Sequence, residues 1–178
     1  MNQGTFKITD TAPPITTALN LLSGASTVAP IDIRMSELID GTSINGDPLV
    51  DGEYPNPLQN VFLIELEYAS GSPLEGLTIQ EPPTLVPPTG NNYEAIEIIL
   101  DGTSYIRINP IKPLKPNTRY VVVVTDEVKD LNGENIAASV SYQNLTDLNE
   151  PLLSNALLPI RSIINGLWEP IAVNYFSN

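Results

Sequence analysis

The stretch that decides the fold is IKPLKPNTRYVVVVTDEVKDLNGENIA, Ile111 to Ala137. Prolines punctuate its first part and lead into the apolar run Tyr120 to Val124, which is rich in the β-branched residues that strands favour. A run that is apolar at every position is typical of a strand covered on both faces. An acidic segment follows and ends in Asn132-Gly133, which is a turn signal. We therefore expect a buried strand that ends in a tight turn.

Other segments alternate apolar and polar residues, as half-buried strands do. Ala95 to Leu100 forms a further expected strand, and Asp101-Gly102 after it predicts a hairpin. Glu65 and Glu67 lie opposite an apolar face, so we interpret this pair as a solvated face rather than an acid-base pair. The apolar faces are Ile31, Ile33 and Met35; Phe62, Ile64, Leu66 and Tyr68; and Ile106 and Ile108.

Seventeen prolines separate these segments and exclude long helices from the first 150 residues. The segment Glu81 to Asn92, EPPTLVPPTGNN, is expected to be an extended, polyproline-like loop. The many short strands predict a mainly β fold, an antiparallel β-sandwich with long Pro/Gly-rich loops and one C-terminal helix. We expect a single domain over residues 1–178, with its strands within about 27–140.

The C-terminal helix is expected over about 156–168, where ALLPIRSIINGLW places apolar residues at helical spacing. Ser154 or Asn155 can cap it, and Pro159 suits its first turn. Pro170 is expected to end or kink the helix. Ile171, Val173 and Tyr175 alternate, which allows a last short strand, with a continued helix as the alternative.

The composition excludes several classes of function. A net charge of −13 disfavours binding to nucleic acids or anionic lipid headgroups. The chain has no His and no Cys, so it lacks an imidazole base, a Ser-His or Cys-His pair and the usual zinc ligands. The first residues do not resemble a signal peptide. The alternative is a longer precursor from which a targeting segment has been removed.

Two serines lie in partial Gly-x-Ser-x-Gly sequences, the pattern that presents the nucleophile of serine hydrolases. Both Ser26 and Ser104 follow the first glycine, but the second glycine is missing in each case. Because no histidine exists to activate either hydroxyl, we expect no catalysis from them.

One acidic loop is a weak candidate for calcium. Its oxygen ligands would be Asp126, Asp130, Asn132 and Glu134, on a loop that contains a glycine, and calcium favours such ligands. The spacing departs from the helix-flanked calcium loop, and a tight turn explains Asn132-Gly133 equally well. A second weak candidate comprises Asp40, Asp47, Asp51 and Glu53. No other cofactor is expected.

The stretch Ile108 to Ile136 resembles a recurrent module of bacterial surface proteins. That module has a Pro-Leu-x-Pro-x-Thr-x-Tyr approach, a Val-rich strand and a Lys-Asp-x-x-Gly turn, all of which this chain contains. The module is an immunoglobulin-like domain of S-layer-type proteins and many extracellular enzymes. The resemblance implies that the stretch is a scaffold strand and its turn.

A narrower resemblance covers most of the chain, from about Leu21 to about Gly166. The order of four segments is similar to that in the N-terminal domain of the bacterial virulence-factor lipase family. These segments are LLSGASTVAPIDIRMS, the strand NVFLIELEY, the Pro-Leu-Lys-Pro module and LLPIRSIING. Those lipases are surface-exposed or secreted, often lipid-anchored, with a catalytic α/β-hydrolase domain downstream. The family's catalytic Ser, Asp and His have no counterpart here.

The resemblance implies a noncatalytic accessory domain that positions or shields the hydrolase domain, outside the cell or on the outer-membrane surface. The alternative is a free-standing immunoglobulin-like binding or adhesion module that recognises sugar, cell wall or another protein. Trp168, the single tryptophan, could bind sugar or another domain if exposed, but on an apolar stripe burial is favoured. The expected interface with the downstream domain comprises Ile160, Ile163, Ile164, Leu167 and Trp168.

Overall fold

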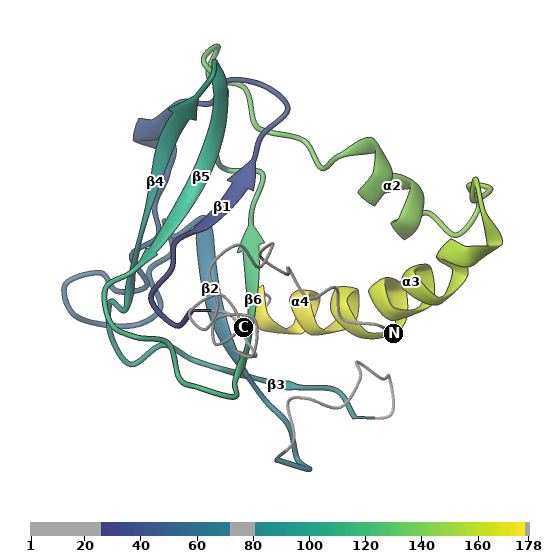
Figure 1. Ribbon diagram of the computed structural model, residues 1–178, viewed down its shortest axis with the longest axis horizontal. Coiled ribbons are helices and arrows are strands. Elements are labelled where there is room, and N and C mark those ends of the chain that lie inside the picture. The colour runs from purple at the N-terminus through teal and green to yellow at the C-terminus, as the bar shows by residue number, and fades with distance from the viewer. Residues whose placement is uncertain (1–25, 72–80, 177–178) are drawn as a thin grey trace, which may run out of the picture.

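The computed structural model describes residues 26–71 and 81–176 (Figure 1). This part of the chain forms two three-stranded antiparallel sheets and a 22-residue C-terminal helix. The mainly β composition predicted from the sequence is confirmed. The immunoglobulin-like assignment stays a prediction, because that fold has roughly seven strands and the described residues hold six.

The first sheet has the order β1-β5-β4 and contains β1 (Ile31–Arg34), β4 (Tyr93–Leu100) and β5 (Thr103–Pro110). The predicted hairpin joins β4 to β5. Asp101 and Gly102 have φ angles of 49° and 75°. Positive φ at both central residues is the requirement of the type I′ turn, which explains why Asp-Gly occurs here.

The second sheet has the order β3-β2-β6 and contains β2 (Val61–Glu67), β3 (Thr84–Val86) and β6 (Arg119–Val124). Strand β3 corrects the prediction that residues 81–92 are a loop throughout. It pairs with β2 between two groups of prolines. An edge strand tolerates such flanking prolines because one side of it needs no ladder hydrogen bonds.

The two sheets share one hydrophobic core. Ile106 and Ile108 of β5 are completely buried, as their alternation with Tyr105 and Arg107 predicts. Ile31 and Ile33 of β1 pack against them, and Val122 and Val124 of β6 approach from the other sheet. The buried core residues are Ile39, Val61, Tyr93, Ile106, Ile108 and Val128.

Strand β2 is covered on both faces, which corrects the interpretation of Glu65. Val61 and Leu63 lie on the same face as Glu65 and pack against the core between the sheets. The opposite face, with Ile64, lies toward the C-terminal helix. The side chain of Glu65 is therefore only 19% exposed, whereas Glu67 is exposed as expected.

Two short helical segments were not predicted from the sequence. The 3-10 turn η1 (Gly41–Ser43) is capped by Asp40, whose side chain accepts a hydrogen bond from the Thr42 N–H. Helix α2 (Val140–Thr146) is capped by Ser139, which accepts from the Tyr142 N–H. Both caps satisfy backbone donors that the first helical turn leaves unpaired.

The C-terminal helix has four consecutive parts: η2 (Asn155–Leu157), α3 (Leu158–Ile163), the π turn η3 (Ile164–Trp168) and α4 (Glu169–Phe176). Ser154 caps its start, as predicted, by accepting from the Ala156 N–H.

The helix continues past Pro170, so the predicted end near residue 168 is wrong and the continued-helix alternative is correct. The turn before the proline is a π turn, in which the Glu169 N–H donates to the Ile164 carbonyl five residues earlier. An α-turn would press the proline ring against the carbonyl of Gly166. The wider π turn separates these groups. Prolines and π-bulges both interrupt the regular hydrogen-bond ladder of an α-helix.

Candidate functional site

Four regions carry the predicted functional residues: the two serines, the acidic loops, the proline-rich approach to β6 and the C-terminal helical region. Ser104 is fully buried on β5. Its Oγ donates to Glu97 Oε1 at 2.6 Å and accepts from the Ile39 N–H at 3.3 Å. Ser26 only accepts from the Val28 N–H two residues on. Ser104 thus ties β4 and β5 to the segment before η1, and its position is structural.

The predicted calcium loop is organised around Asp130. Its carboxylate accepts from the Asn132 N–H at 2.8 Å, from Asn132 Nδ2 at 3.0 Å and from the Glu134 N–H at 2.9 Å. The Asn132 side chain, followed by the Glu134 N–H, lowers the pKa of Asp130. Gly133 has a φ of 82° and donates to the Asp130 carbonyl, which closes the expected turn.

The structure does not gather the other acidic residues around this turn. Within residues 26–71 and 81–176, no three carboxylate side chains lie close enough together to hold a metal ion. In the second candidate loop, the Thr42 hydroxyl donates a hydrogen bond to the Asp40 carboxylate. This hydrogen bond is the main cause of the lowered pKa of Asp40. Asp51, with a φ of 53°, forms a two-residue turn with Gly52. Calcium binding at either loop stays a prediction.

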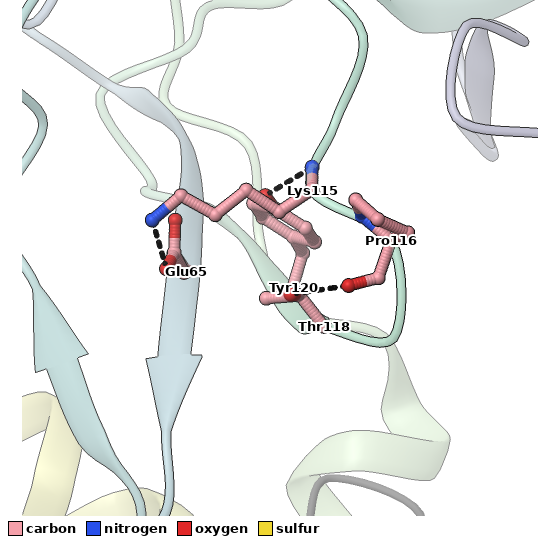
Figure 2. Close-up of polar contacts among 5 residues, drawn as sticks. All are labelled: Glu65, Lys115, Pro116, Thr118 and Tyr120. Atoms are coloured by element: carbon pink, nitrogen blue, oxygen red, sulfur yellow. Dashed lines mark hydrogen bonds and ion pairs between the residues drawn. The ribbon is translucent and has the colours of Figure 1, made fainter. Parts of the chain in front are cut away.

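The proline-rich approach to β6 forms a corner held by Tyr120 (Figure 2). The Lys115 N–H donates to Tyr120 Oη at 3.0 Å, and Thr118 Oγ1 donates to the Pro116 carbonyl at 3.0 Å. Between them, Asn117 has a φ of 51°, a conformation that Asn tolerates better than most residues. These contacts explain why Pro, Asn, Thr and Tyr follow one another at this spacing.

An ion pair joins this corner to the neighbouring strand. Lys115 Nζ lies 2.7 Å from Glu65 Oε1 on β2, and this hydrogen bond raises the pKa of Lys115 (Figure 2). The Leu114 N–H also donates to the Thr27 carbonyl at 2.8 Å, which connects the corner to the segment before β1. The corner is therefore a structural junction, as its sequence pattern suggested.

The helical residues after the sheets form a separate unit, here called the C-terminal arm and defined as residues 140–176. Its helices are joined by polar contacts at the C-terminal end of α2. Arg161 Nη2 donates to the carbonyls of Asn144 and Glu150, and Asn165 Nδ2 donates to the Leu145 carbonyl at 2.9 Å. Last-turn carbonyls have no partner within their own helix, so these side chains satisfy them.

The arm places the predicted interface residues in different environments. Leu167 is 2% exposed, whereas Ile160 is 46% exposed. Ile163, Ile164 and Trp168 are half-buried. Trp168 faces the sheet side of the arm, where it lines a cavity. The structure therefore divides the set: Leu167 is internal, and Ile160 is available to a partner.

The end of the arm packs on β2. The rings of Phe176 and Phe62 lie 5.0 Å apart in an edge-to-face arrangement, and the hydroxyls of Tyr175 and Tyr54 are 2.8 Å apart. Tyr142 of α2 donates a hydrogen bond to Glu169, and burial raises the pKa of Tyr142 to about 12. Sequence reasoning missed these contacts because they link residues far apart in the chain.

A cavity of about 440 Å³ separates the arm from the second sheet. On the arm it is lined at helical spacing by Ile164, Trp168, Ile171, Ala172 and Phe176. On the sheet it is lined by Ile64, Leu85 and Val121 to Val124. Volume and apolar lining fall within the range of ligand-binding pockets. The alternation of the strands predicted apolar faces here, but not the gap between them.

In the described parts of the chain, none of the helices has the length and apolar character needed to cross a membrane. No curated protein and no solved structure matches the chain. A family model does match, over more than half of the length, and it covers β3 to β6, the corner at Tyr120 and nearly all of the arm. The chain belongs to the family described as bacterial virulence factor lipase N-terminal, matched over residues 68–174.

Proposed function

We propose that this chain is the noncatalytic N-terminal domain of an extracellular bacterial lipase and that it positions or shields a downstream α/β-hydrolase domain. Membership of the lipase N-terminal family is the observation that carries the proposal. The parent protein would be the lipase or esterase, and residues 1–178 would act as one accessory domain. We further propose that the parent is secreted or held at the outer-membrane surface, with a lipid anchor upstream.

The chemistry of the chain supports a noncatalytic role. Acyl transfer needs a nucleophile beside a base that can take its proton. The sequence contains no His or Cys. Ser104 is buried and its hydroxyl donates a hydrogen bond to Glu97 within the sheet, where no ester could reach it. Catalysis would therefore belong to the downstream domain.

The geometry of the corner supports an immunoglobulin-like classification. In immunoglobulin-like sandwiches a tyrosine near the start of one strand hydrogen-bonds the backbone a few residues upstream. Tyr120 lies at the second position of β6 and accepts from the Lys115 N–H (Figure 2). We infer that the two sheets are a reduced form of that sandwich, with the arm in place of its last strand.

The exposed side of the arm supports docking to the hydrolase domain. Leu153, Leu158 and Ile160 are exposed close to one another in sequence, at the start of the C-terminal helix. Such a group of apolar side chains marks an interaction surface more often than an isolated exposed leucine does.

A binding experiment tests the proposal. The 178-residue chain and the separately produced downstream domain should associate in isothermal titration calorimetry. Ile160→Asp should weaken association by roughly tenfold or more, as loss of an interface anchor does. Leu58→Asp, at an exposed leucine outside the arm, is the matched control and should leave the affinity unchanged.

Ester hydrolysis gives a second measurement. The full-length protein should hydrolyse p-nitrophenyl esters, and the 178-residue chain should show only background turnover. Turnover by the chain that disappeared in Ser104→Ala would refute the noncatalytic assignment. Absence of any association between the two parts would refute the docking role.

A further inference from the structure

We infer that the outer edge of β6 is an acceptor site for one extended strand, supplied by the downstream domain of the same polypeptide. The source of the strand rests on the proposed function, whereas the acceptor site itself rests on the geometry of β6. Figure 1 shows β6 between β2 and the helices of the arm. Because the sheet order is β3-β2-β6, β6 pairs on one side only within residues 26–71 and 81–176.

The register identifies which backbone groups point away from the sheet. Thr125 donates its N–H to the Asn60 carbonyl, so this opposed pair is hydrogen-bonded. Hydrogen-bonded and non-hydrogen-bonded pairs alternate along an antiparallel ladder. Val124 opposes Val61 and Val122 opposes Leu63, so both fall at non-hydrogen-bonded positions. Their N–H and C=O groups are therefore directed to the free edge.

These outward groups have no hydrogen-bond partner within residues 26–71 and 81–176. The edge also lacks the usual protection of an edge strand. Proteins normally place lysine, proline or a bulge on an open edge to prevent pairing with another chain. The single charged residue of β6 is Arg119 at its first position, and Tyr120 to Val124 contain neither a charge nor a proline. An edge of this composition is expected to be paired in the complete protein.

Two cavities flank the edge, one on each face of the sheet. The cavity beneath the arm reaches Val122 and Val124 together with Ser139 and Tyr142. On the core side, a cavity of about 370 Å³ touches Val124 as well, and its lining combines the apolar residues Ile33, Met35 and Ile136 with polar ones such as Arg34 and Asp126. An added strand would direct successive side chains into these two cavities, because strand side chains alternate between faces.

This arrangement selects a strand over other occupants. Outward groups two residues apart are spaced by about 6.6–6.8 Å, which matches the donors and acceptors of an extended chain. A lipid has no such series of groups. The edge lies in a recess beside Ala138, Ser139 and Tyr142, which suits one slender segment better than the edge of a second complete sheet. The added strand would need apolar side chains at both odd and even positions, so that each of the two cavities is filled.

Residue-resolved amide hydrogen exchange tests the inference on the 178-residue chain and on the full-length protein. In the chain, Val121 and Val123 should exchange slowly because they bond β2, whereas Val122 and Val124 should exchange fast. In the full-length protein, Val122 and Val124 should slow by roughly 100-fold or more, as paired core strands do. Fast exchange at both positions in the full-length protein would overturn the inference, as would slow exchange at both in the chain.

A pair of variants links that protection to the cavity. In the full-length protein, Ala172→Trp should fill the space beneath the arm and return Val122 and Val124 to fast exchange. Val173→Trp, on the neighbouring position that is 63% exposed, should not. If the two domains associate but Ala172→Trp leaves the protection intact, the strand site is wrong while the docking role stands. If the domains do not associate, the docking role and the assigned source of the strand both fail.

Discussion

The two-sheet part of the molecule and the C-terminal arm are built in different ways. Of the buried hydrophobic residues in the described chain, all but Leu167 belong to the two-sheet part. The sheets cover each other and close a core, whereas within the arm polar contacts join the C-terminal helix to α2, and the arm meets β2 through its last residues. The comparison indicates that the sheets close a core by their own packing, and under the proposed function the downstream domain would complete the arm.

The largest effect is expected in the shared core. Ile106→Ala removes a fully buried side chain and should lower the free energy of unfolding by about 2–5 kcal/mol, because the surrounding residues cannot close the cavity. Ile160→Ala on the arm is the matched control and should change it by less than about 0.5 kcal/mol. Urea denaturation of the 178-residue chain measures both. Equal losses would show that the arm is packed as tightly as the core.

The next effect concerns pH and the core residue Tyr93. Its hydroxyl donates to the Val61 carbonyl and accepts from Gln59 Nε2, and burial raises its pKa to about 12. The unfolded value is about 10. The folded state therefore favours the neutral phenol, and this stabilisation is present below about pH 10 and is lost as pH rises toward 12. The unfolding free energy should fall by roughly 2–3 kcal/mol over that window.

Tyr93→Phe provides the control for this pH dependence. The variant should be less stable at neutral pH, because Gln59 and the Val61 carbonyl lose a buried partner. Its unfolding free energy should also lack the part of the decrease with rising alkaline pH that comes from Tyr93. Tyr142, on the arm, has a raised pKa as well, so some slope remains in both proteins. An unchanged slope in Tyr93→Phe would exclude Tyr93 as its source.

A smaller effect is expected at the corner before β6. Tyr120→Phe removes the acceptor of the Lys115 N–H and should cost about 1 kcal/mol, the net contribution of one hydrogen bond. Thr118→Val removes the shorter-range contact to the Pro116 carbonyl and serves as a comparison within the same corner. Thermal melts of the two variants measure the difference. A larger loss for Thr118→Val would mean that the proline turn, not the tyrosine, holds the corner.

The strands could be predicted because the alternation of apolar and polar side chains indicates which face of each strand is buried. Alternation identified β1, β2 and β5, and Asp101-Gly102 identified the hairpin through its requirement for positive φ. The uniform run in β6 predicted cover on both faces. Val122 and Val124 pack on the core and the arm lies on the other face, but all six residues of β6 are half-buried instead of fully buried. Local chemistry is sufficient for such elements.

The remaining features depend on partners distant in the sequence. Alternation identified an apolar face on β2, but it could not state that Leu63 packs in the core beside Glu65 or that Ile64 meets the arm. The π turn before Pro170 reflects a local conflict that propensity scales do not resolve. For the candidate site, the exposed Ile160 and the buried Leu167 have the same apolar character in the sequence, and only packing separates them.

The smallest effect on stability, and the sharpest test of the comparison, is expected at Ile160. A charge at a buried position destabilises strongly because it lacks a partner, whereas a charge at an exposed position remains hydrated. Ile160→Asp should therefore change the unfolding free energy of the 178-residue chain by less than about 0.5 kcal/mol, although it should weaken the proposed binding of the downstream domain. Leu167→Asp, seven residues later on the same helix, should destabilise the chain clearly. If Ile160→Asp also unfolded the arm, as judged by loss of helical circular dichroism, weaker binding would reflect a damaged helix, and the arm would be part of the folded core instead of a surface that awaits its partner.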